Sequence, residues 1–445
     1  MNNINDLITK AKKFYDEKNF FDARAQLLKV LEENQIDEKL KLTLYYLVAD
    51  ICYKINDFKT SEVYLLKYIK INNTNSKIFN FLGNVYLKIR NYANSEKFYL
   101  KSINLDHENE NALINLAVLY NNLGKQKKAA SSYKKILKNN PLNIGSLYNL
   151  FNIDKTAINK KKILELEDYI KKKKLNNFNM ASSFFLLAEN EKKQKKFSKE
   201  INLLKKANDY SFKVNESINK QSNKYWLEII PNKFQRINYN KEDISNKTEN
   251  IFPIFIIGLP RCGSTLIESI ISSGGDEIEN FGETNLVNWA FLNTNRDILF
   301  SSRSLKKEEK IEINFKKTAT KLKDVFDNLR SHKDIKKNIF SEKSLENFYY
   351  IELILNIYPN AKFLNPTRNL VDNTFAIYKQ FLSNISWSHS IENILSYIDN
   401  YLKVLDFFKK KYPNKIFSIS LENFTKHPKK KSMEIYKFCN LVWDE

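Results

Sequence analysis

Apolar and small residues recur in the first part of the chain with a period of about 34 positions, which is typical of helix-turn-helix repeats. In the range 110–143, Ala117 and Tyr120 fall on one predicted helix, and Tyr133 falls on the next. The positions one period earlier hold residues of the same kinds, namely Gly83, Tyr86 and Tyr99. Small residues let paired helices approach each other, and large aromatic residues fill the space between units. We therefore interpret the tyrosines as packing residues and assign no binding residue to this half.

Two earlier units follow the same pattern and hold Ala11, Phe14, Ala23 and Leu27, then Ala49, Cys52, Ser61 and Leu65. After Asn143 the pattern weakens, although Leu187, Ala188, Leu204 and Ala207 indicate one further helical pair. The array is therefore predicted to occupy residues 1–212. It resembles the tetratricopeptide repeat family, whose arrays usually present a concave surface to a peptide or partner domain, so the resemblance implies a protein partner.

A helical linker is predicted for residues 213–250, with a short helix near Tyr225 followed by a polar segment rich in Asn and Lys. The pattern then changes to a continuous apolar run at 254–257, which is typical of a strand buried on both faces of a parallel sheet. A glycine-containing loop and a predicted helix over 266–273 follow. The sequence thus predicts an α plus α/β protein: a helical solenoid, then a P-loop-like α/β domain over residues 251–445.

The loop at 258–265 has a composition suited to binding an anion. Successive backbone amides in such a turn and at the helix N-terminus point into one space, and Gly263 lets the backbone come close to a ligand. The spacing from Gly258 to Gly263 matches the loop of nucleoside triphosphatases, but Ser264 stands where that loop requires lysine. A kinase or ATPase is therefore disfavoured, while an ordinary strand-to-helix turn stays open.

The segment from Pro260 to Leu266 resembles the 5′-phosphosulfate loop of sulfotransferases that use 3′-phosphoadenosine 5′-phosphosulfate (PAPS), with Cys262 in place of the usual serine. The resemblance implies that PAPS is the donor and that the loop residues bind it. These residues are Arg261, Cys262, Gly263, Ser264 and Thr265. Arg261 is also expected to stabilise charge on the transferred group.

A second segment, from Arg368 to Asn373, resembles the family's 3′-phosphate motif. Arg368 carries over as the ligand of the 3′-phosphate, a role that suits a planar bidentate donor. The donor-binding position that the family fills with serine is Ala376 here, so one hydroxyl contact is missing. This departure is expected to weaken affinity for the donor.

Between these segments, Glu283 follows a glycine where the repeat-containing and tyrosylprotein branches of the family carry a Gly-Glu pair. We expect Glu283 to act as the catalytic base that removes the proton of the acceptor hydroxyl. Lys343 lies in a segment that resembles the family's Asp-Lys-Met-Pro-x-Asn motif, with Glu342 in place of the aspartate. The resemblance implies that Lys343 contacts the donor and helps the nucleotide leave. Glu422 follows a further predicted strand.

Composition changes this picture little. The 445-residue chain carries a formal net charge of +22, but Lys is enriched in every segment, so we expect help in attracting a polyanionic donor and neither nucleic acid nor membrane binding. Cys52, Cys262 and Cys439 are far apart and lack metal-ligand spacing, so no disulfide framework and no metal site is predicted. Without an apolar leader or spanning segment in the sequence, a cytoplasmic location is expected.

Two hypotheses stay open beside the preferred one. The first is a non-catalytic repeat scaffold with a degenerate sulfotransferase domain, motivated by Ala376 and the short C-terminal end. The second is a nucleoside-triphosphate kinase, which Ser264 disfavours. Under the preferred hypothesis the acceptor hydroxyl belongs to a peptide tyrosine, a carbohydrate or a small molecule.

Overall fold

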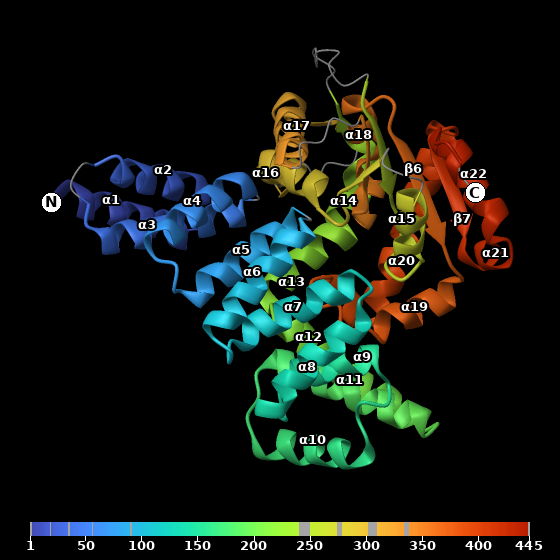
Figure 1. The fold of residues 1–445 in the computed structure, drawn as a ribbon. Coiled ribbons are helices and arrows are strands. Elements are labelled where there is room, and N and C mark those ends of the chain that lie inside the picture. Colours follow the sequence, from blue (N-terminus) through green and yellow to red (C-terminus); the bar gives the residue numbers. More distant parts are fainter. Residues whose placement is uncertain are drawn as a thin grey trace. The chain divides into compact units, whose positions relative to one another are not determined.

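A computed structural model describes residues 2–17, 19–33, 36–55, 57–89, 91–239, 250–273, 278–300, 309–332 and 338–443 (Figure 1). The chain divides into two compact units. One comprises Met1–Asn159 with Val325–Asp334, and the other comprises Lys160–Asp324 with Ile335–Glu445. The borders predicted from the sequence at residues 212 and 250 mark changes of sequence pattern, and they stay a prediction.

The first unit is built from consecutive antiparallel helix pairs, coloured blue to cyan in Figure 1. Its helices are α1 (Asn2–Asp16), α2 (Phe20–Leu31), α3 (Glu38–Lys54), α4 (Phe58–Ile71), α5 (Ser76–Lys88), α6 (Tyr92–Leu105), α7 (Glu110–Asn122), α8 (Gln126–Asn139) and α9 (Ile144–Ile153). The helical solenoid predicted from the sequence is confirmed.

Polar contacts repeat with the same period as the apolar residues. The hydroxyl of Ser61 donates to the carbonyl of Ala49 at 2.9 Å, and the hydroxyl of Ser95 donates to the carbonyl of Gly83 at 2.9 Å. Side chains that accept from backbone amides begin equivalent helices, at Asn75, Asn109 and Asn143. Each cap satisfies an amide that the helix itself leaves without a partner.

Replacing Gly83 with alanine is expected to lower the free energy of unfolding by about 1–3 kcal/mol, because the added methyl would overpack the helix interface. Its Cβ would lie 2.4 Å from two ring atoms of Tyr99, which is itself fully buried. Thermal unfolding measures the change. The double variant Gly83→Ala/Tyr99→Leu recreates the pair found at Ala49 and Leu65, so it should relieve the clash. An unchanged Tm in Gly83→Ala would contradict this account.

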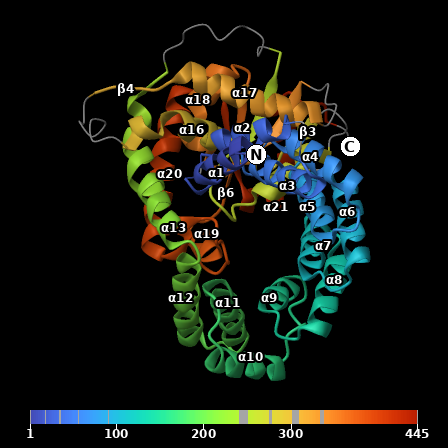
Figure 2. The same cartoon turned by 90° about the vertical axis from the view of Figure 1, so that its left-hand side faces the viewer.

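The second unit opens with a run of helices that leads to the sheet (Figure 2, green). They are α10 (Lys160–Lys172), α11 (Asn177–Lys193), α12 (Phe197–Lys213), α13 (Glu216–Asn223), the π-helix η1 (Lys224–Ile229), α14 (Ile230–Lys233) and the 3-10 helix η2 (Phe234–Arg236). A short strand β1 (Ile237–Asn238) then pairs in parallel with β4 (Ile311–Glu312). The predicted helix near Tyr225 is η1.

The main sheet has the strand order β3-β5-β2-β6-β7, and every neighbouring pair is parallel. Its strands are β2 (Phe252–Ile256), β3 (Ile278–Asn280), β5 (Ile339–Glu342), β6 (Lys362–Thr367) and β7 (Ile416–Ser420). The predicted parallel sheet is confirmed. Because all strands point the same way, the segments that follow them meet at one edge.

Helices cover both faces of this sheet (Figure 1). On one face, Ile254 and Ile256 pack with residues of α15 (Ser264–Ser273) and α22 (Pro428–Cys439). On the other face, the ring of Phe255 stacks on Phe363 at 5.7 Å. The same side holds the 3-10 helix η5 (Leu345–Tyr350), α18 (Ile351–Ile357) and α20 (Ile391–Lys411). The central strand is therefore buried on both faces, which explains its continuous apolar run.

The remaining described elements of this unit are α16 (Leu286–Phe300), α17 (Phe315–His332, partly in the first unit), α19 (Leu370–Tyr378), the 3-10 helix η6 (Ser386–His389) and α21 (Leu421–Lys426). None of the helices in the described ranges combines the length and the apolar character that crossing a membrane requires.

Stability is expected to fall in mild acid because of His389. The ring is 7% exposed, meets Phe212 edge to face, and has no hydrogen-bond partner among the described residues. Burial lowers the pKa of His389 from 6.5 to about 4. Between these two pH values the unfolded chain binds a proton that the folded chain does not, so stability is lost as pH falls through this window.

The expected loss at this histidine is about 2 kcal/mol between pH 7.5 and pH 5. Denaturant unfolding at both pH values gives the free energy of unfolding of the native chain and of His389→Leu. The contribution of His389 is the loss between the two pH values that the native chain shows and the variant does not. The matched control is His427→Leu, because His427 is exposed. An equal pH dependence in the native chain and His389→Leu would show that His389 does not titrate in this way.

Candidate functional site

The motifs identified in the sequence follow five neighbouring strands at the carboxyl edge of the sheet. Glu283 lies in the segment after β3, and Lys343 directly follows β5. The loop 257–263 follows β2, Arg368 follows β6, and Glu422 follows β7. In open parallel sheets, ligands bind in the crevice outside the carboxyl ends of the strands. Residues as far apart in sequence as Arg261 and Glu422 are thus gathered along one edge, as the strand order requires.

The loop after β2 has a backbone shaped for an anion. Gly258, Arg261 and Gly263 adopt positive φ values of 142°, 66° and 95°. Alternating left- and right-handed residues turn successive amides toward one point, and α15 begins at Ser264 with its N-terminus at the loop. A Cβ at Gly263 would lie 2.9 Å from Cδ1 of Leu421, so glycine is required by space and by backbone conformation.

The side chains of this loop divide into an exposed and a buried group. Arg261 and Thr265 are exposed, and no residue in the described part of the chain pairs with the guanidinium of Arg261. Cys262 is 1% exposed, and burial raises the pKa of its thiol to about 11. Ser264 is also buried. Cys262 is therefore a neutral packing residue, and its enclosed thiol side chain offers no contact to a ligand.

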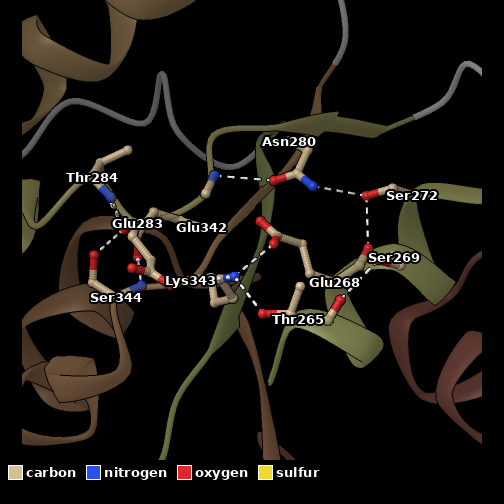
Figure 3. Close-up of polar contacts among 11 residues, drawn as sticks. Thr265, Glu268, Ser269, Ser272, Asn280, Glu283, Thr284, Glu342, Lys343 and Ser344 are labelled. Atoms are coloured by element: carbon tan, nitrogen blue, oxygen red, sulfur yellow. Dashed lines mark hydrogen bonds and ion pairs between the residues drawn. The ribbon is translucent and has the colours of Figure 1, made fainter. Parts of the chain in front are cut away.

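Lys343 lies at the centre of the polar site (Figure 3). Its Nζ donates to Oγ1 of Thr265 at 3.2 Å, and it forms ion pairs with Oε2 of Glu268 at 2.8 Å and Oε1 of Glu283 at 3.3 Å. The side chains of Lys343 and Glu268 are 7% and 10% exposed, whereas that of Glu283 is 66% exposed. The ammonium therefore lies between one hydroxyl and two carboxylates, and the carboxylates balance its charge.

A lysine reaches the loop after β2 from another segment, although the loop itself contains no lysine. Ser264 stands where phosphate-binding loops of nucleoside triphosphatases carry a lysine. Here the ammonium of Lys343 reaches the same helix N-terminus from the neighbouring strand β5, at Thr265. The structure thus brings three of the predicted residues together: Thr265, Lys343 and Glu283.

Glu268 belongs to this site, although the sequence analysis did not select it. It lies one helical turn after Thr265 on α15, so both side chains reach the same lysine. The available signal was a carboxylate within the apolar run of Leu266, Ile267, Ile270 and Ile271. A carboxylate in such a position is rarely buried unless it is paired, and the partner lies 75 positions further along the chain.

Glu342 fixes the segment that carries Glu283. Its buried carboxylate accepts from the amide and hydroxyl of Thr284 at 3.2 and 2.7 Å, from the amide of Ser344 at 3.0 Å, and from the amide group of Asn347 at 2.6 Å. The hydroxyl of Ser344 also donates to it. Burial raises the pKa of Glu342, while these hydrogen bonds act in the opposite direction. The backbone amide of Lys343 donates to the carbonyl of Gly282 at 2.8 Å.

Glu342→Gln is expected to lower the free energy of unfolding by about 2–4 kcal/mol, because the amide would turn a donor toward groups that are themselves donors. Denaturant unfolding of the full chain measures the change. Glu434→Gln is the matched control, since that carboxylate pairs with Lys431 at the surface. A loss no larger than that of the control would show that the contacts of Glu342 do not hold the segment.

Arg368 is half-buried at the start of the next segment and precedes the N-cap of α19. The side chain of Asn369 accepts from the amides of Val371 and Asp372 at 3.0 and 3.1 Å. The backbone amide of Asn369 donates to Oε1 of Glu422 at 2.8 Å, and this contact is the largest cause of a lowered pKa of Glu422. The end of β7 therefore helps to fix the position of Arg368.

A further contact joins α19 to the loop after β2. The side-chain amide of Asn373, fully buried, donates to the carbonyl of Pro260 at 2.8 Å. Ala376 lies one turn further along α19 and is half-buried. Its methyl offers no hydrogen bond, so the helix face that follows Arg368 lacks the hydroxyl that the family motif would supply.

Metal ligands do not gather within the described ranges, where no group of three or more His, Cys, Asp or Glu side chains has the geometry to hold a metal ion.

An open hollow of about 780 Å³ lies over α22, lined by residues between Lys429 and Lys437 and by Leu441 and Trp443. It contains none of the motif residues.

Comparison with known proteins identifies both halves of the chain. A model of the sulfotransferase family matches residues 253–445, and a tetratricopeptide repeat model matches 42–75, 76–109 and 110–141. A relative from Aquifex aeolicus (strain VF5), known as "Uncharacterized protein", is 24% identical over 277 residues. The match covers 60% of this chain and 35% of the relative, so the chain spans about a third of that protein's length.

Three solved structures are similar to the chain. MamA is 17% identical, with a TM-score of 0.32, over 44% of this chain and 95% of that chain. A tetratricopeptide repeat protein from Parabacteroides merdae is 15% identical, with a TM-score of 0.33, over 47% of this chain and 94% of that chain. Pseudomonas aeruginosa pilF is 13% identical, with a TM-score of 0.34, over 48% of this chain and 91% of that chain.

The family models agree with the architecture described above: helix pairs of the repeat type precede a parallel sheet with a loop-to-helix turn after its central strand. Residues 253–445 are therefore a domain of the sulfotransferase family, and tetratricopeptide repeats at 42–141 precede it.

Proposed function

We propose that the protein is a PAPS-dependent sulfotransferase that transfers a sulfuryl group to an acceptor hydroxyl. The observation that carries the proposal is the position of the Lys343 ammonium, which links the loop residue Thr265 to the exposed carboxylate of Glu283. A cation that faces both an anion-binding loop and a carboxylate base suits a reaction in which a hydroxyl attacks an anionic group. The exposed Arg261 and the half-buried Arg368 add positive charge along the same edge of the sheet.

The donor supplies an activated sulfuryl group and a nucleotide that leaves with both of its phosphates. In the transfer, the acceptor oxygen forms a bond to sulfur, and the bond from sulfur to the bridging oxygen of the 5′-phosphate breaks. The loop amides and Arg261 would stabilise charge on the sulfuryl group, and Arg368 would bind the 3′-phosphate. Glu283 would accept the proton of the acceptor hydroxyl. Positioning and electrostatics thus supply most of the rate enhancement.

The contacts of Lys343 indicate how the base becomes available. The ammonium of Lys343 has three polar partners, namely Thr265, Glu268 and Glu283, so a donor oxygen would compete with them for it. Of the three contacts of Lys343, the one with Glu283 is the longest. The side chain of Glu283 is also more exposed than that of Glu268. Glu268 would retain the lysine, and Glu283 would be released to receive the proton.

The activity is tested with PAPS labelled in the sulfuryl group. The full chain is incubated with a phenol, a tyrosyl peptide and an oligosaccharide, and label on the acceptor and release of 3′-phosphoadenosine 5′-phosphate are both measured. We expect labelling by the native chain and its loss in Lys343→Met, with Lys403→Met as a control on the exposed face of α20. Label on one acceptor would also identify the acceptor class.

Two outcomes would favour the other hypotheses. Binding of the nucleotide without transfer to any acceptor would favour a scaffold with a degenerate domain, as the Ala376 departure suggests. Transfer of the terminal phosphate of ATP would revive the kinase hypothesis despite Ser264. The repeat array would in either case offer a surface to a protein partner.

A further inference from the structure

The helices α11 and α12 reach the end of α19, the helix that follows Arg368. The side-chain amide of Asn208 on α12 donates to the carbonyl of Tyr378 at 3.0 Å and to the carbonyl of Leu204 at 3.0 Å. Tyr378 is the last residue of α19, and Asn208 is 1% exposed. Carbonyls at a helix C-terminus have no partner within the helix. Asn208 therefore caps α19 from a distance of 170 positions in sequence.

An ion pair between a buried carboxylate and a partly exposed lysine lies beside this cap. Glu200 on α12 has a side chain that is 4% exposed, and its Oε1 lies 3.0 Å from Nζ of Lys379. Lys379 is the C-cap residue of α19, where a positive charge interacts favourably with the helix dipole. Removing the lysine would leave the buried carboxylate without compensation. The end of α19 is thus tied to α12 by both a hydrogen bond and an ion pair.

The segment after α19 packs on the same helices. The ring of Phe381 lies 5.0 Å from that of Phe178 and 5.6 Å from that of Phe185, both on α11. Further along, the hydroxyl of Ser386 donates at 3.0 Å to the hydroxyl of Ser222 on α13, the helix that follows α12. The helix pair α11–α12 therefore belongs to the structure that surrounds α19, and these faces are occupied by the chain itself.

The other end of α19 follows Arg368, the residue proposed to bind the 3′-phosphate. Arg368 and Asn369 precede its first turn, and Asn373 in its middle donates to the carbonyl of Pro260 in the loop after β2. The helix is nine residues long. Its backbone hydrogen bonds make such a short helix move as one body, so a displacement at Tyr378 reaches Arg368 and Asn373.

We propose that the α11–α12 pair positions α19 for the donor, and that Asn208 and Glu200 are positioning residues for the 3′-phosphate. The inference rests on the proposed function. Under this proposal, α11 and α12 act as part of the catalytic domain and not as part of the repeats at 42–141. Their buried polar residues set the position of Arg368 through α19.

The test compares two nucleotides on the full chain. Calorimetry gives the Kd of 3′-phosphoadenosine 5′-phosphate and of adenosine 5′-phosphate, which lacks the 3′-phosphate. Asn208→Leu is expected to raise the Kd of 3′-phosphoadenosine 5′-phosphate by about tenfold and that of adenosine 5′-phosphate by less than about twofold. The matched control is Asn400→Leu, because Asn400 donates to the carbonyl of Leu227 at 3.2 Å and makes no hydrogen bond to α19 among the described residues.

Glu200→Gln keeps the side-chain shape and provides a second variant if Asn208→Leu does not fold. It should show the same selective loss for the nucleotide that carries a 3′-phosphate. Equal losses for both nucleotides, or no loss in either variant, would overturn the positioning role while leaving the proposed function intact. A native chain that binds neither nucleotide would overturn the proposed function and this inference together.

Discussion

Arg368→Ala should weaken the binding of 3′-phosphoadenosine 5′-phosphate on the order of 100-fold. An arginine that forms two hydrogen bonds to a phosphate contributes about 3 kcal/mol, and alanine removes both bonds and the charge. Arg368 is half-buried at the carboxyl end of β6, and the segment is held by the contact between Asn369 and Glu422. Calorimetric titration of the full chain measures the Kd directly.

A loss of affinity that is confined to the nucleotide with a 3′-phosphate would identify the 3′-phosphate as the group that Arg368 contacts. Adenosine 5′-phosphate should bind the native chain and Arg368→Ala with similar affinity, because it lacks the group that Arg368 is proposed to bind. Lys403→Ala is the control for removing a positive charge, since its ammonium pairs with Asp399 on an exposed helix face. Equal weakening of both nucleotides in Arg368→Ala would place Arg368 outside the 3′-phosphate site.

Glu283→Gln should lower kcat by about 10²–10⁴-fold while the Kd of the product nucleotide changes by less than about twofold. Glutamine keeps the length of the side chain and retains an oxygen that accepts from Lys343, but it does not take up a proton at neutral pH. Because the Glu283 side chain is 66% exposed, its replacement removes little packing. Steady-state kinetics with labelled PAPS and the acceptor found in the screen measure kcat.

A surface glutamate controls for this substitution. Glu392→Gln changes an exposed carboxylate at the start of α20 and should leave kcat unchanged. An unchanged kcat in Glu283→Gln would mean that another group removes the proton. A kcat that falls together with nucleotide affinity would mean that the substitution disturbs the donor site through Lys343.

The sequence predicts the fold well where residues form a repeated or continuous pattern. The 34-residue period selects Gly83 and Tyr99 as packing residues, and in the structure the two lie in close contact. The apolar run at 254–257 predicts the central strand, because a strand covered on both faces has no polar side. Both features are local, so they are visible in a single stretch of sequence.

The sequence is less informative where a contact joins distant segments. The strands β3 and β5 are three and four residues long and lack a distinctive pattern, so the part of the sheet that they form beside β2 is not predicted. The burial of Glu268 depends on Lys343 across 75 positions, and the cap on α19 depends on Asn208 across 170 positions. Only the strand order and the packing of α12 reveal these pairs.

The candidate site shows the same difference between what a local pattern predicts and what only the folded structure reveals. The resemblance of the loop and of the Arg368 segment to family motifs selects residues that the structure places along one edge of the sheet. It does not show that Cys262 and Ser264 are buried while Arg261 and Thr265 are exposed. The roles of these residues in binding and catalysis stay predictions that the variants above test.

The central claim is that the carboxyl edge of this sheet binds the sulfate donor. Calorimetric titration of the unmodified full chain with 3′-phosphoadenosine 5′-phosphate tests it most directly. The account predicts one site with a Kd in the micromolar range, or about −8 kcal/mol, and weaker binding of adenosine 5′-phosphate. No heat of binding at millimolar nucleotide would contradict the claim and favour a scaffold that has lost the donor site.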